Sequence, residues 1–301
     1  MEPLPAHVTR TILALYGDGG RAWLDRLPAL LSTCAERWSL RILPPFSELS
    51  YNYVAPAVRA DGSPAVLKAG VPNPELATEI AALRFYAGRG IVRLLDADPA
   101  WGVLLLERLQ PGTLLSTLED DEEATRIAAG VMRALWRPAP AGGPFPDLPR
   151  WFAALGGLRR RFDGGTGPLP LFLVELAERL LPDLLATAAA PVLLHGDLHH
   201  MNILRAEREP WLALDPKGVI GEPAYEVGAF LYNPLGFSSR PGLPRLLARR
   251  LDILAAELGL ERERLIAWGI AQAVLSACWS VEEGGGWEEV LVCAEVLADM
   301  L

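Results

Sequence analysis

Residues 192–217 read VLLHGDLHHMNILRAEREPWLALDPK and combine two short apolar runs with a polar loop between them. The second apolar run, 211–214, ends directly before Asp215. In the loop, Asn202 follows Asp197 by five positions, and Asp215 follows Asp197 by eighteen. We expect both runs to be short strands that end at the same edge of one sheet, because that arrangement would bring the three polar side chains into one cleft.

Two carboxylates and one carboxamide at this spacing suit phosphoryl transfer from ATP. Asp197 would orient a substrate hydroxyl and accept its proton late, while Asn202 and Asp215 would hold Mg²⁺. An ordinary aspartate has a pKa near ~3.9, so it is a weak base, and positioning would supply most of its effect. The pattern therefore predicts a kinase catalytic loop followed by a metal-binding aspartate, with ATP and Mg²⁺ as cofactors.

The same loop leaves two alternatives. Its polar residues His195, Asp197, His199 and His200 include three of the four histidines in the chain and could ligate zinc in a hydrolase. Against zinc, the adjacent His199 and His200 point in different directions in most backbones, and no further His or Cys cluster follows downstream. A purely structural loop is the other alternative, because Gly and Asp are common in turns. We favour the kinase loop over both.

Composition and cysteine usage indicate a soluble globular protein. The 301 residues suffice for two lobes with separate cores, and about half of them are apolar. No apolar run approaches the roughly 20 residues of a membrane span, and the N-terminus does not resemble an export signal. Cys34, Cys278 and Cys293 are odd in number and widely spaced, which argues against a disulfide framework. We therefore expect a cytoplasmic protein without a membrane partner.

The N-terminal third combines helical and strand patterns. Apolar residues recur at helical spacing within about 8–39, and Pro28 is expected to start a new helix or to kink a longer one. An Asp61-Gly62 pair further on predicts a hairpin turn. The expected strands, which would form an antiparallel five-stranded sheet, are 40–43, 51–58, 65–68, 92–95 and 103–107.

Lys68 and Glu79 are the expected phosphate-binding pair of this sheet lobe. Lys68 emerges from an apolar strand, and the next helix is expected to start at Asn73-Pro74, because asparagine caps helices and proline fits their first turn. Glu79 lies beside the apolar stripe of that helix, whereas Glu75 lies further toward solvent. A strand lysine and a helix glutamate anchor ATP phosphates in kinases, so Glu79 is the expected partner of Lys68. The alternative is that Glu79 belongs to a solvated helix face.

A break at 109–112, Leu-Gln-Pro-Gly, marks the expected boundary between the lobes, because long helical patterns dominate beyond it. We predict an α+β chain with a nucleotide-binding lobe at 1–108 and a mainly helical lobe at 109–301 that holds the catalytic loop and the substrate site. In a kinase-like arrangement the backbone of Glu107 and Leu109 would bond the adenine edge, which requires no particular side chain.

Several segments carry a family resemblance over nearly the whole chain: AWLDRLP at 22–28, SYNYV at 50–54, VLK at 66–68, VRLL at 92–95, LLER at 105–108 and LLHGDLHHMNIL at 193–204. The most specific are LDPKG at 214–218 and GEPAYE at 221–226. With these motifs the chain resembles the aminoglycoside phosphotransferase family, and within it the streptomycin 6-kinase and hydroxyurea phosphotransferase branch.

The resemblance implies a two-lobed, protein-kinase-like fold and ATP-dependent O-phosphorylation of a small molecule. It assigns the role of catalytic base to Asp197 and the role of Mg²⁺ ligand to Asn202 and Asp215. It also implies that Lys68 contacts the α and β phosphates and that Glu79 steadies it.

Four further residues take their expected roles from this resemblance. Ser50 and Asn52 lie where the phosphate-covering loop belongs, and their side chains would supply donors because 46–54 contains no glycine. His195 is expected to brace the catalytic loop. Glu226 stands where related kinases tend to have Asp, and it is expected to accept hydrogen bonds from the backbone of that loop.

The leading substrate is streptomycin or a related hydroxylated cation. Streptomycin carries two guanidinium groups, which favour carboxylates in bidentate geometry, and the net charge of −9 is compatible with a cationic ligand. The candidates are Glu282 and Glu283, expected in a loop after Trp279, with ordinary solvent-facing acids as the alternative. A second acidic run, 119–123, has the pattern of a solvated turn and helix start. The acidic balance also disfavours a nucleic-acid partner, which requires a basic face.

Other functions stay open at this point. Hydroxyurea or an unidentified metabolite are alternative acceptors, because a fold and its motifs determine a reaction better than an acceptor. A catalytically silent nucleotide-binding regulator is an alternative of a different class, against which the complete set of kinase residues counts. A protein kinase is disfavoured by the Asp215-Pro216-Lys217 sequence and by the lack of a recognisable activation segment.

Overall fold

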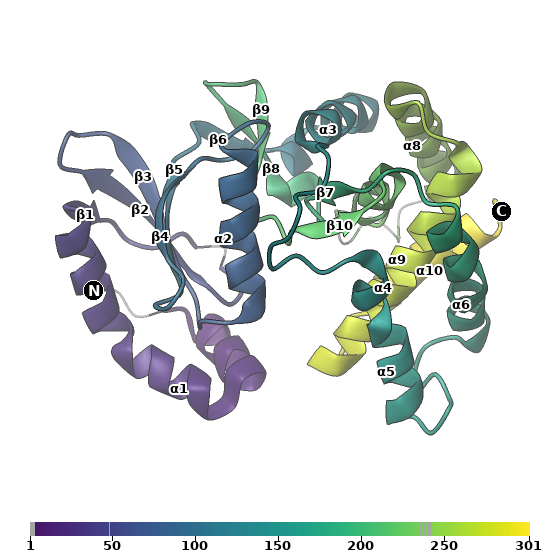
Figure 1. Cartoon of the computed structure of the whole chain (residues 1–301), viewed down its shortest axis with the longest axis horizontal. Helices are drawn as coiled ribbons and strands as arrows, with labels where there is room; N and C mark the ends of the chain where they lie inside the picture. The colour runs from purple at the N-terminus through teal and green to yellow at the C-terminus, as the bar shows by residue number, and fades with distance from the viewer. Residues whose placement is uncertain (1–3, 48, 235, 237–238, 240–241) are drawn as a thin grey trace. The chain divides into compact units, whose positions relative to one another are not determined.

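The computed structural model describes residues 4–47, 49–234, 236, 239 and 242–301. The chain divides into two compact units, Met1–Gly112 and Thr113–Leu301. The first is built on an antiparallel sheet and the second is mainly helical (Figure 1). This is the α+β class that the sequence predicts.

Five antiparallel strands form the sheet of the first unit, in the order β1-β2-β3-β5-β4. Their bounds are β1 (Leu40–Ile42), β2 (Tyr53–Arg59), β3 (Pro64–Ala69), β4 (Leu94–Asp98) and β5 (Val103–Glu107). The predicted Asp61-Gly62 hairpin joins β2 to β3. Gly62 has a φ of 83°, and its N–H donates to the Arg59 carbonyl at 2.9 Å.

The position of β4 differs from its prediction at 92–95. The strand starts at Leu94 and continues to Asp98. Asp98 Oδ1 accepts the backbone N–H groups of Ala100 and Trp101, at 3.1 and 3.2 Å, so the turn begins only at Asp98. Side-chain chemistry at the turn therefore sets the end of this strand.

Helix α1 (Ala6–Arg37) covers part of the sheet core with its apolar side. Its non-helical residue is Gly17, with a φ of 53° and a ψ of −128°. Pro28 lies inside this long helix, so the predicted start of a new helix there is wrong, and the alternative of a kink at Pro28 stays a prediction. Glycine adopts a positive φ without the steric cost of a Cβ atom, so the chain changes direction where the backbone is most permissive.

Helix α2 (Pro74–Tyr86) starts where the sequence predicts and runs alongside β4 (Figure 1). Asn73 caps it by accepting the Leu76 N–H at 2.9 Å, and Pro74 occupies the first helical position. The helix ends at Ala87, which is left-handed with a φ of 50°. The helix thereby presents Glu79 toward the interior of the unit, where it is 5% exposed.

Helix α9 (Arg262–Glu283) is the central core element of the second unit and packs against α5, α6, α7, α8 and α10 (Figure 1). Among the described residues it is the one helix long and apolar enough to cross a membrane, but 78% of its apolar window is buried inside the protein. The remaining helices are α3 (Asp121–Leu135), α4 (Leu148–Trp151), α5 (Ala153–Arg161), α6 (Leu171–Ala186), α7 (Val227–Leu231), α8 (Leu243–Leu258) and α10 (Glu288–Ala298).

Two small sheets carry the loop that the sequence singled out. One pairs β7 (Val192–Leu194) with β10 (Val219–Gly221), and the other has the order β6-β8-β9. The strands of the second are β6 (Pro111–Leu114), β8 (Ile203–Ala206) and β9 (Trp211–Ala213). The prediction that the two apolar runs share one sheet is therefore wrong. Because β8 and β9 form a local hairpin, β7 pairs instead with the strand that follows Asp215.

Candidate active site

The candidate catalytic loop begins at His195, directly after β7. The carbonyl of His195 accepts the N–H groups of Lys217 and Gly218, at 2.7 and 3.1 Å. Gly196 has a φ of 86°, and a Cβ atom there would lie 2.9 Å from Val219 Cγ2 and 3.2 Å from Lys217 Cβ. The backbone conformation and the close approach of the neighbouring segment both require glycine at this position.

His195 braces the loop, as predicted. Its Nε2 lies 2.8 Å from the Leu214 carbonyl, and its Nδ1 accepts the Asp197 N–H at 3.3 Å. Because a carbonyl oxygen only accepts, the ring hydrogen is on Nε2. Burial lowers the pKa of His195 to about 4, so the ring is neutral at pH 7. A neutral, fully buried ring with both nitrogens engaged serves as a structural link between the segments that carry Asp197 and Asp215.

Glu226 holds the start of the loop by its backbone N–H groups, also as predicted. Its two oxygens accept the backbone N–H groups of His195 and Gly196, at 2.7 and 2.9 Å. Burial raises the pKa of Glu226 to about 7, the two N–H groups act in the opposite direction, and the negative charge of Asp197 adds to the increase. The carboxyl group is fully buried and contacts backbone, so its role is structural.

Asp197 and Asn202 are joined by a hydrogen bond that orients the amide. Asn202 Nδ2 donates to the backbone carbonyl of Asp197 at 2.9 Å, which turns the amide oxygen Oδ1 to the other side. An amide oxygen is a hard ligand of the type that Mg²⁺ prefers. The Asp197 side chain is 34% exposed, so its carboxylate is accessible from solvent.

Asp215 is tied to the same loop through its neighbour. The Leu214 N–H donates to the Asn202 carbonyl at 2.9 Å, and Asp215 follows with a left-handed φ of 63°. Aspartate tolerates this conformation better than most residues, and such strain concentrates at functional sites. The residues that the sequence proposes as catalytic base and Mg²⁺ ligands are thus brought together by hydrogen bonds between loops. An amide oxygen and carboxylate oxygens form a donor set that fits Mg²⁺.

In the first unit, Lys68 of β3 and Glu79 of α2 form the expected ion pair. Lys68 Nζ lies 2.8 Å from each of the two Glu79 oxygens. The residues are only 6% and 5% exposed, so both charges are largely removed from water. A buried pair of this geometry requires both partners, because either one alone would leave an uncompensated charge.

Two other residues proposed for nucleotide contacts lie before β2. Asn52 packs its side-chain oxygen directly over Gly70, leaving no space for a Cβ atom there, and Gly70 follows the end of β3. Ser50 is exposed and makes a bend in the chain. Asn52 is therefore held close to the strand that carries Lys68.

The proposed hinge residues differ in how their backbone is used. The Glu107 N–H donates to the Arg93 carbonyl at 2.9 Å, and Glu107 Oε2 accepts the Arg93 N–H at 3.0 Å. The Glu107 N–H is therefore engaged within the unit, whereas Leu109 is half-buried and lies outside any strand.

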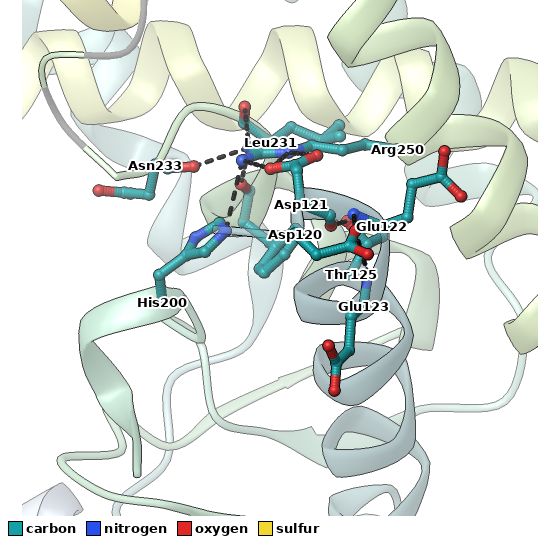
Figure 2. A network of polar contacts seen from close by, with 10 residues as sticks. Asp120, Asp121, Glu122, Glu123, Thr125, His200, Leu231, Asn233 and Arg250 are labelled. Atoms are coloured by element: carbon teal, nitrogen blue, oxygen red, sulfur yellow. Dashed lines mark hydrogen bonds and ion pairs between the residues drawn. The ribbon is translucent and has the colours of Figure 1, made fainter. Parts of the chain in front are cut away.

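A buried arginine that the sequence did not single out organises the region around α8 (Figure 2). Arg250 is 2% exposed, and its guanidinium contacts Asp121 with Nε at 3.0 Å and Nη2 at 2.5 Å. Its Nη1 donates to three backbone carbonyls, those of Phe230, Leu231 and Asn233. Nothing in the sequence of a helix distinguishes a buried arginine from one that faces solvent.

This network corrects the interpretation of the acidic run 119–123 as merely solvated. Asp120 caps α3 by accepting the N–H groups of Glu122 and Glu123, at 2.9 and 3.1 Å. Asp121, by contrast, neutralises the buried Arg250 (Figure 2). The adjacent carboxylates separate because α3 begins between them.

Glu222, in the GEPAYE segment, is a second carboxylate with a structural role. The sequence did not predict this role. Its side chain is 1% exposed and is contacted by the Arg264 guanidinium at 2.6 and 2.9 Å and by the Trp268 indole N–H. It also accepts the Ala189 N–H at 3.1 Å. The segment GEPAYE therefore places two buried glutamates, Glu222 and Glu226, against different partners.

The proposed substrate acids are not in a loop. Glu282 and Glu283 form the last turn of α9, which ends only at the left-handed Gly284. The Glu282 carboxylate lies beside Gly157 of α5, with Oε1 3.7 Å from where a Cβ atom on Gly157 would be. The helix continues because its apolar face stays packed up to Val281, which is 6% exposed.

The histidines of the loop do not converge on one point. His200 is buried, and its ring stacks on Phe230 with 4.0 Å between centroids. His199 instead faces Asp197, 3.8 Å from Nε2 to Oδ1. Within the part of the chain that the structure describes, no three His, Cys, Asp or Glu side chains form a metal-binding group, so a zinc hydrolase has no ligand set there.

Comparisons with known proteins agree with this architecture. The chain is 35% identical over 296 residues to a streptomycin 6-kinase of Streptomyces glaucescens, covering 94% of this chain and 91% of the relative. It is 38% identical over 290 residues to a hydroxyurea phosphotransferase of Kitasatospora aureofaciens, covering 93% and 81%. A crystal structure of a thermostable mutant of aminoglycoside phosphotransferase APH(4)-Ia, in ternary complex with ADP and hygromycin B, matches with a TM-score of 0.63 at 14% identity, covering 89% of this chain and 96% of that chain.

A choline kinase from Streptococcus pneumoniae has the same fold, with a TM-score of 0.61 at 14% identity, covering 90% of this chain and 99% of that chain. Fold and relatives together define an enzyme of the phosphotransferase class with a protein-kinase-like fold. The chain belongs to the aminoglycoside/hydroxyurea antibiotic resistance kinase family, whose model matches residues 45–284.

Proposed function

We propose that this enzyme is an ATP- and Mg²⁺-dependent O-phosphotransferase that acts on a hydroxyl group of a small molecule. The observation that carries the proposal is the hydrogen-bonded assembly of the loop, in which Asn202 Nδ2 binds the Asp197 carbonyl and the Leu214 N–H binds the Asn202 carbonyl. A purely structural loop has no need of an oriented amide oxygen, a strained Asp215 and a half-buried Asp197 carboxylate that solvent still reaches.

The chemistry follows from these groups. The substrate hydroxyl oxygen attacks the γ-phosphorus of ATP, the bond from that phosphorus to the bridging oxygen breaks, and ADP leaves. Asp197 orients the hydroxyl and receives its proton as the new ester forms. Asn202 Oδ1 and the Asp215 carboxylate are the proposed Mg²⁺ ligands. Bound Mg²⁺ neutralises charge on the phosphates.

The first unit supplies the nucleotide-binding groups in this proposal. Lys68 contacts the α and β phosphates and Glu79 holds its side chain, while Ser50 and Asn52 cover the phosphates. The hinge backbone at Glu107 and Leu109 bonds the adenine edge. Support comes from the Lys68–Glu79 pair, in which Lys68 Nζ lies 2.8 Å from each Glu79 oxygen.

Streptomycin is the leading acceptor and hydroxyurea the second. Relatives at 34–38% identity carry both names. Streptomycin is cationic, so the proposal gives its guanidinium groups a carboxylate partner, with Glu282 and Glu283 as candidates. Hydroxyurea is uncharged, so the variant Glu282→Gln/Glu283→Gln should raise KM for streptomycin and leave KM for hydroxyurea unchanged. We place the enzyme in the cytoplasm, where ATP is available, without a nucleic-acid or membrane partner.

The testing experiment is ADP release by the purified protein with ATP and Mg²⁺, across streptomycin, other aminoglycosides and hydroxyurea. Streptomycin-dependent turnover in the wild type, with turnover at least about a hundredfold lower in Asp197→Asn, is the expected result. The Asp197→Asn variant should still bind ATP, because this side chain acts on the acceptor. ATP binding without turnover on any acceptor would point to a silent regulator or to an unidentified metabolite.

A further inference from the structure

Two adjacent histidines in the catalytic loop have different surroundings. The His199 ring faces the proposed catalytic groups, with Nε2 3.8 Å from Asp197 Oδ1 and 3.3 Å from Asn202 Nδ2. Its Nδ1 accepts the backbone N–H of Met201 at 3.2 Å. The His200 ring points into the core, against Phe230 and Arg250.

The contacts of His199 determine which of its nitrogens carries the hydrogen. Neutral imidazole has one donor and one acceptor nitrogen, so the ring cannot accept from both Met201 N–H and Asn202 Nδ2. A hydrogen on Nδ1 would point at the Met201 N–H, so that two hydrogen-bond donors would face each other. A hydrogen on Nε2 also faces a donor, Asn202 Nδ2 at 3.3 Å, but it has an acceptor nearby in the Asp197 carboxylate, with Oδ1 3.8 Å from Nε2. The favourable arrangement therefore has Nδ1 accepting and Nε2–H directed at Asp197.

The orientation of Asn202 supports the same arrangement. Its Nδ2 donates to the Asp197 carbonyl at 2.9 Å, and turning the amide over would set two oxygens against each other. Asn202 therefore presents N–H groups toward His199 and gives the ring no acceptor. The groups described near Nε2 are Asn202 Nδ2 and the Asp197 carboxylate, and of these two the carboxylate can accept a hydrogen bond.

We propose that His199 is a positioning residue for the Asp197 carboxylate. The inference rests on the proposed phosphotransfer function and adds to it a residue that holds the catalytic base. The backbone bond from Met201 fixes the ring, and the ring directs Nε2–H at Oδ1, an interaction that shortens when nucleotide and acceptor are bound. The carboxylate is then held for the hydroxyl proton, and the gain appears in the chemical step.

Two substitutions separate this role from a purely structural one. In His199→Asn, the side-chain oxygen replaces Nδ1 and keeps the bond from Met201, whereas the donor toward Asp197 is lost. In His199→Gln, the amide N–H reaches the position of Nε2, whereas the Met201 bond is lost. The two variants therefore divide the functions of the ring between loop stability and carboxylate positioning.

The expected kinetic result is a split between the variants. His199→Asn should keep a wild-type melting temperature and KM for ATP, while kcat falls about ten- to a hundredfold. His199→Gln should melt at a lower temperature and recover kcat to within about threefold of wild type. A kcat of His199→Asn within about twofold of wild type would overturn the proposal, as would an equal loss of kcat in both variants.

A second measurement needs no turnover. In ¹⁵N-labelled protein at about pH 8.5, above the ordinary histidine range, ring ¹⁵N shifts should show the hydrogen of His199 on Nε2. His200 is the internal contrast, because Arg250 Nη2 can only donate to its Nε2 at 3.3 Å, which requires the hydrogen on Nδ1. A hydrogen on Nδ1 of His199 would overturn the inference. Absence of turnover in the wild type would refute the proposed function alone, because the ring measurement still decides the geometry of His199.

Discussion

The carboxylate of Glu226 accepts the backbone N–H of His195 at 2.7 Å, across 31 positions of the sequence. Its second oxygen accepts the neighbouring Gly196 N–H at 2.9 Å. These two bonds hold the start of the loop that leads to Asp197, at the point where Gly196 turns the chain with a φ of 86°. The geometry of the proposed catalytic residue therefore depends on a buried group that does not contact it.

We expect Glu226 to make stability depend on pH. Burial raises its pKa from 4.5 to about 7, so the folded protein retains a proton that the unfolded chain has released between those values. Its contribution to the free energy of unfolding is fully present below pH 4.5 and is lost as the pH rises through about 7. The change is on the order of 3 kcal/mol.

Glu226→Gln provides the control, because an amide does not titrate. The variant should be less stable, since its NH₂ group faces a backbone N–H, at a cost of about 1–3 kcal/mol. The difference in the free energy of unfolding between wild type and variant should shrink as the pH rises from 4.5 to about 7.5, as measured by urea unfolding at each pH. A difference that stays constant over this range would contradict the assignment of the titration to Glu226.

The Lys68–Glu79 pair predicts non-additive stability. Lys68→Met or Glu79→Leu alone should lower the free energy of unfolding by about 3–5 kcal/mol, because each leaves one buried charge unpaired. The double variant should recover most of that loss, since two apolar side chains then replace two charges. Urea unfolding measures this coupling. Calorimetry with ATP should show no binding recovery in the double variant, and losses that simply add would exclude the buried pair.

We expect two substitutions of Asp215 to separate its effect on backbone conformation from its effect on metal binding. Asp215→Asn tolerates the left-handed φ of 63° and should fold normally while losing Mg²⁺-dependent ATP binding. Asp215→Ala should lose the same binding and in addition about 1–2 kcal/mol of stability, because alanine is strained there. Melting curves and calorimetry with and without Mg²⁺ provide both readings. Equal Mg²⁺ dependence in wild type and Asp215→Asn would remove Asp215 from the metal site.

Arg250 predicts an asymmetric cost for its ion pair with Asp121. The Arg250 side chain is 2% exposed and that of Asp121 is 29% exposed. Arg250→Met should therefore lower the free energy of unfolding by about 3–5 kcal/mol, because it breaks the ion pair and also leaves three backbone carbonyls without their donor. Asp121→Ala leaves the buried guanidinium without its carboxylate, but it should cost less than Arg250→Met, because the guanidinium still donates to those three carbonyls (Figure 2).

The neighbouring Arg249 is the matched control for these variants. Its side chain is 59% exposed and pairs with Glu122 at 3.3 Å, so Arg249→Met should change stability by less than about 1 kcal/mol. Urea unfolding of the three variants tests the order. Equal losses in Arg249→Met and Arg250→Met would show that burial does not govern the difference.

Local elements and the residues of the candidate loop were accessible from the sequence. The Asn73 cap and the Asp61-Gly62 turn depend on residues a few positions apart, whose turn chemistry acts within one segment. The same holds for Asp197, Asn202 and Asp215, which share one stretch of chain. The pairing of Lys68 with Glu79 was also predictable, because a strand and the following helix are neighbours in space.

Partnerships between distant segments were decided by tertiary structure. Arg250 meets Asp121 across 129 positions, and the sequence assigned that acidic run to solvent. The strands before Asp197 and Asp215 entered separate sheets, because a hairpin of β8 and β9 formed locally and β7 paired with β10. The sequence by itself determined which side chains carry the proposed chemistry. Tertiary structure determined which buried groups hold them, because burial and pairing depend on surfaces that meet only when the chain has folded.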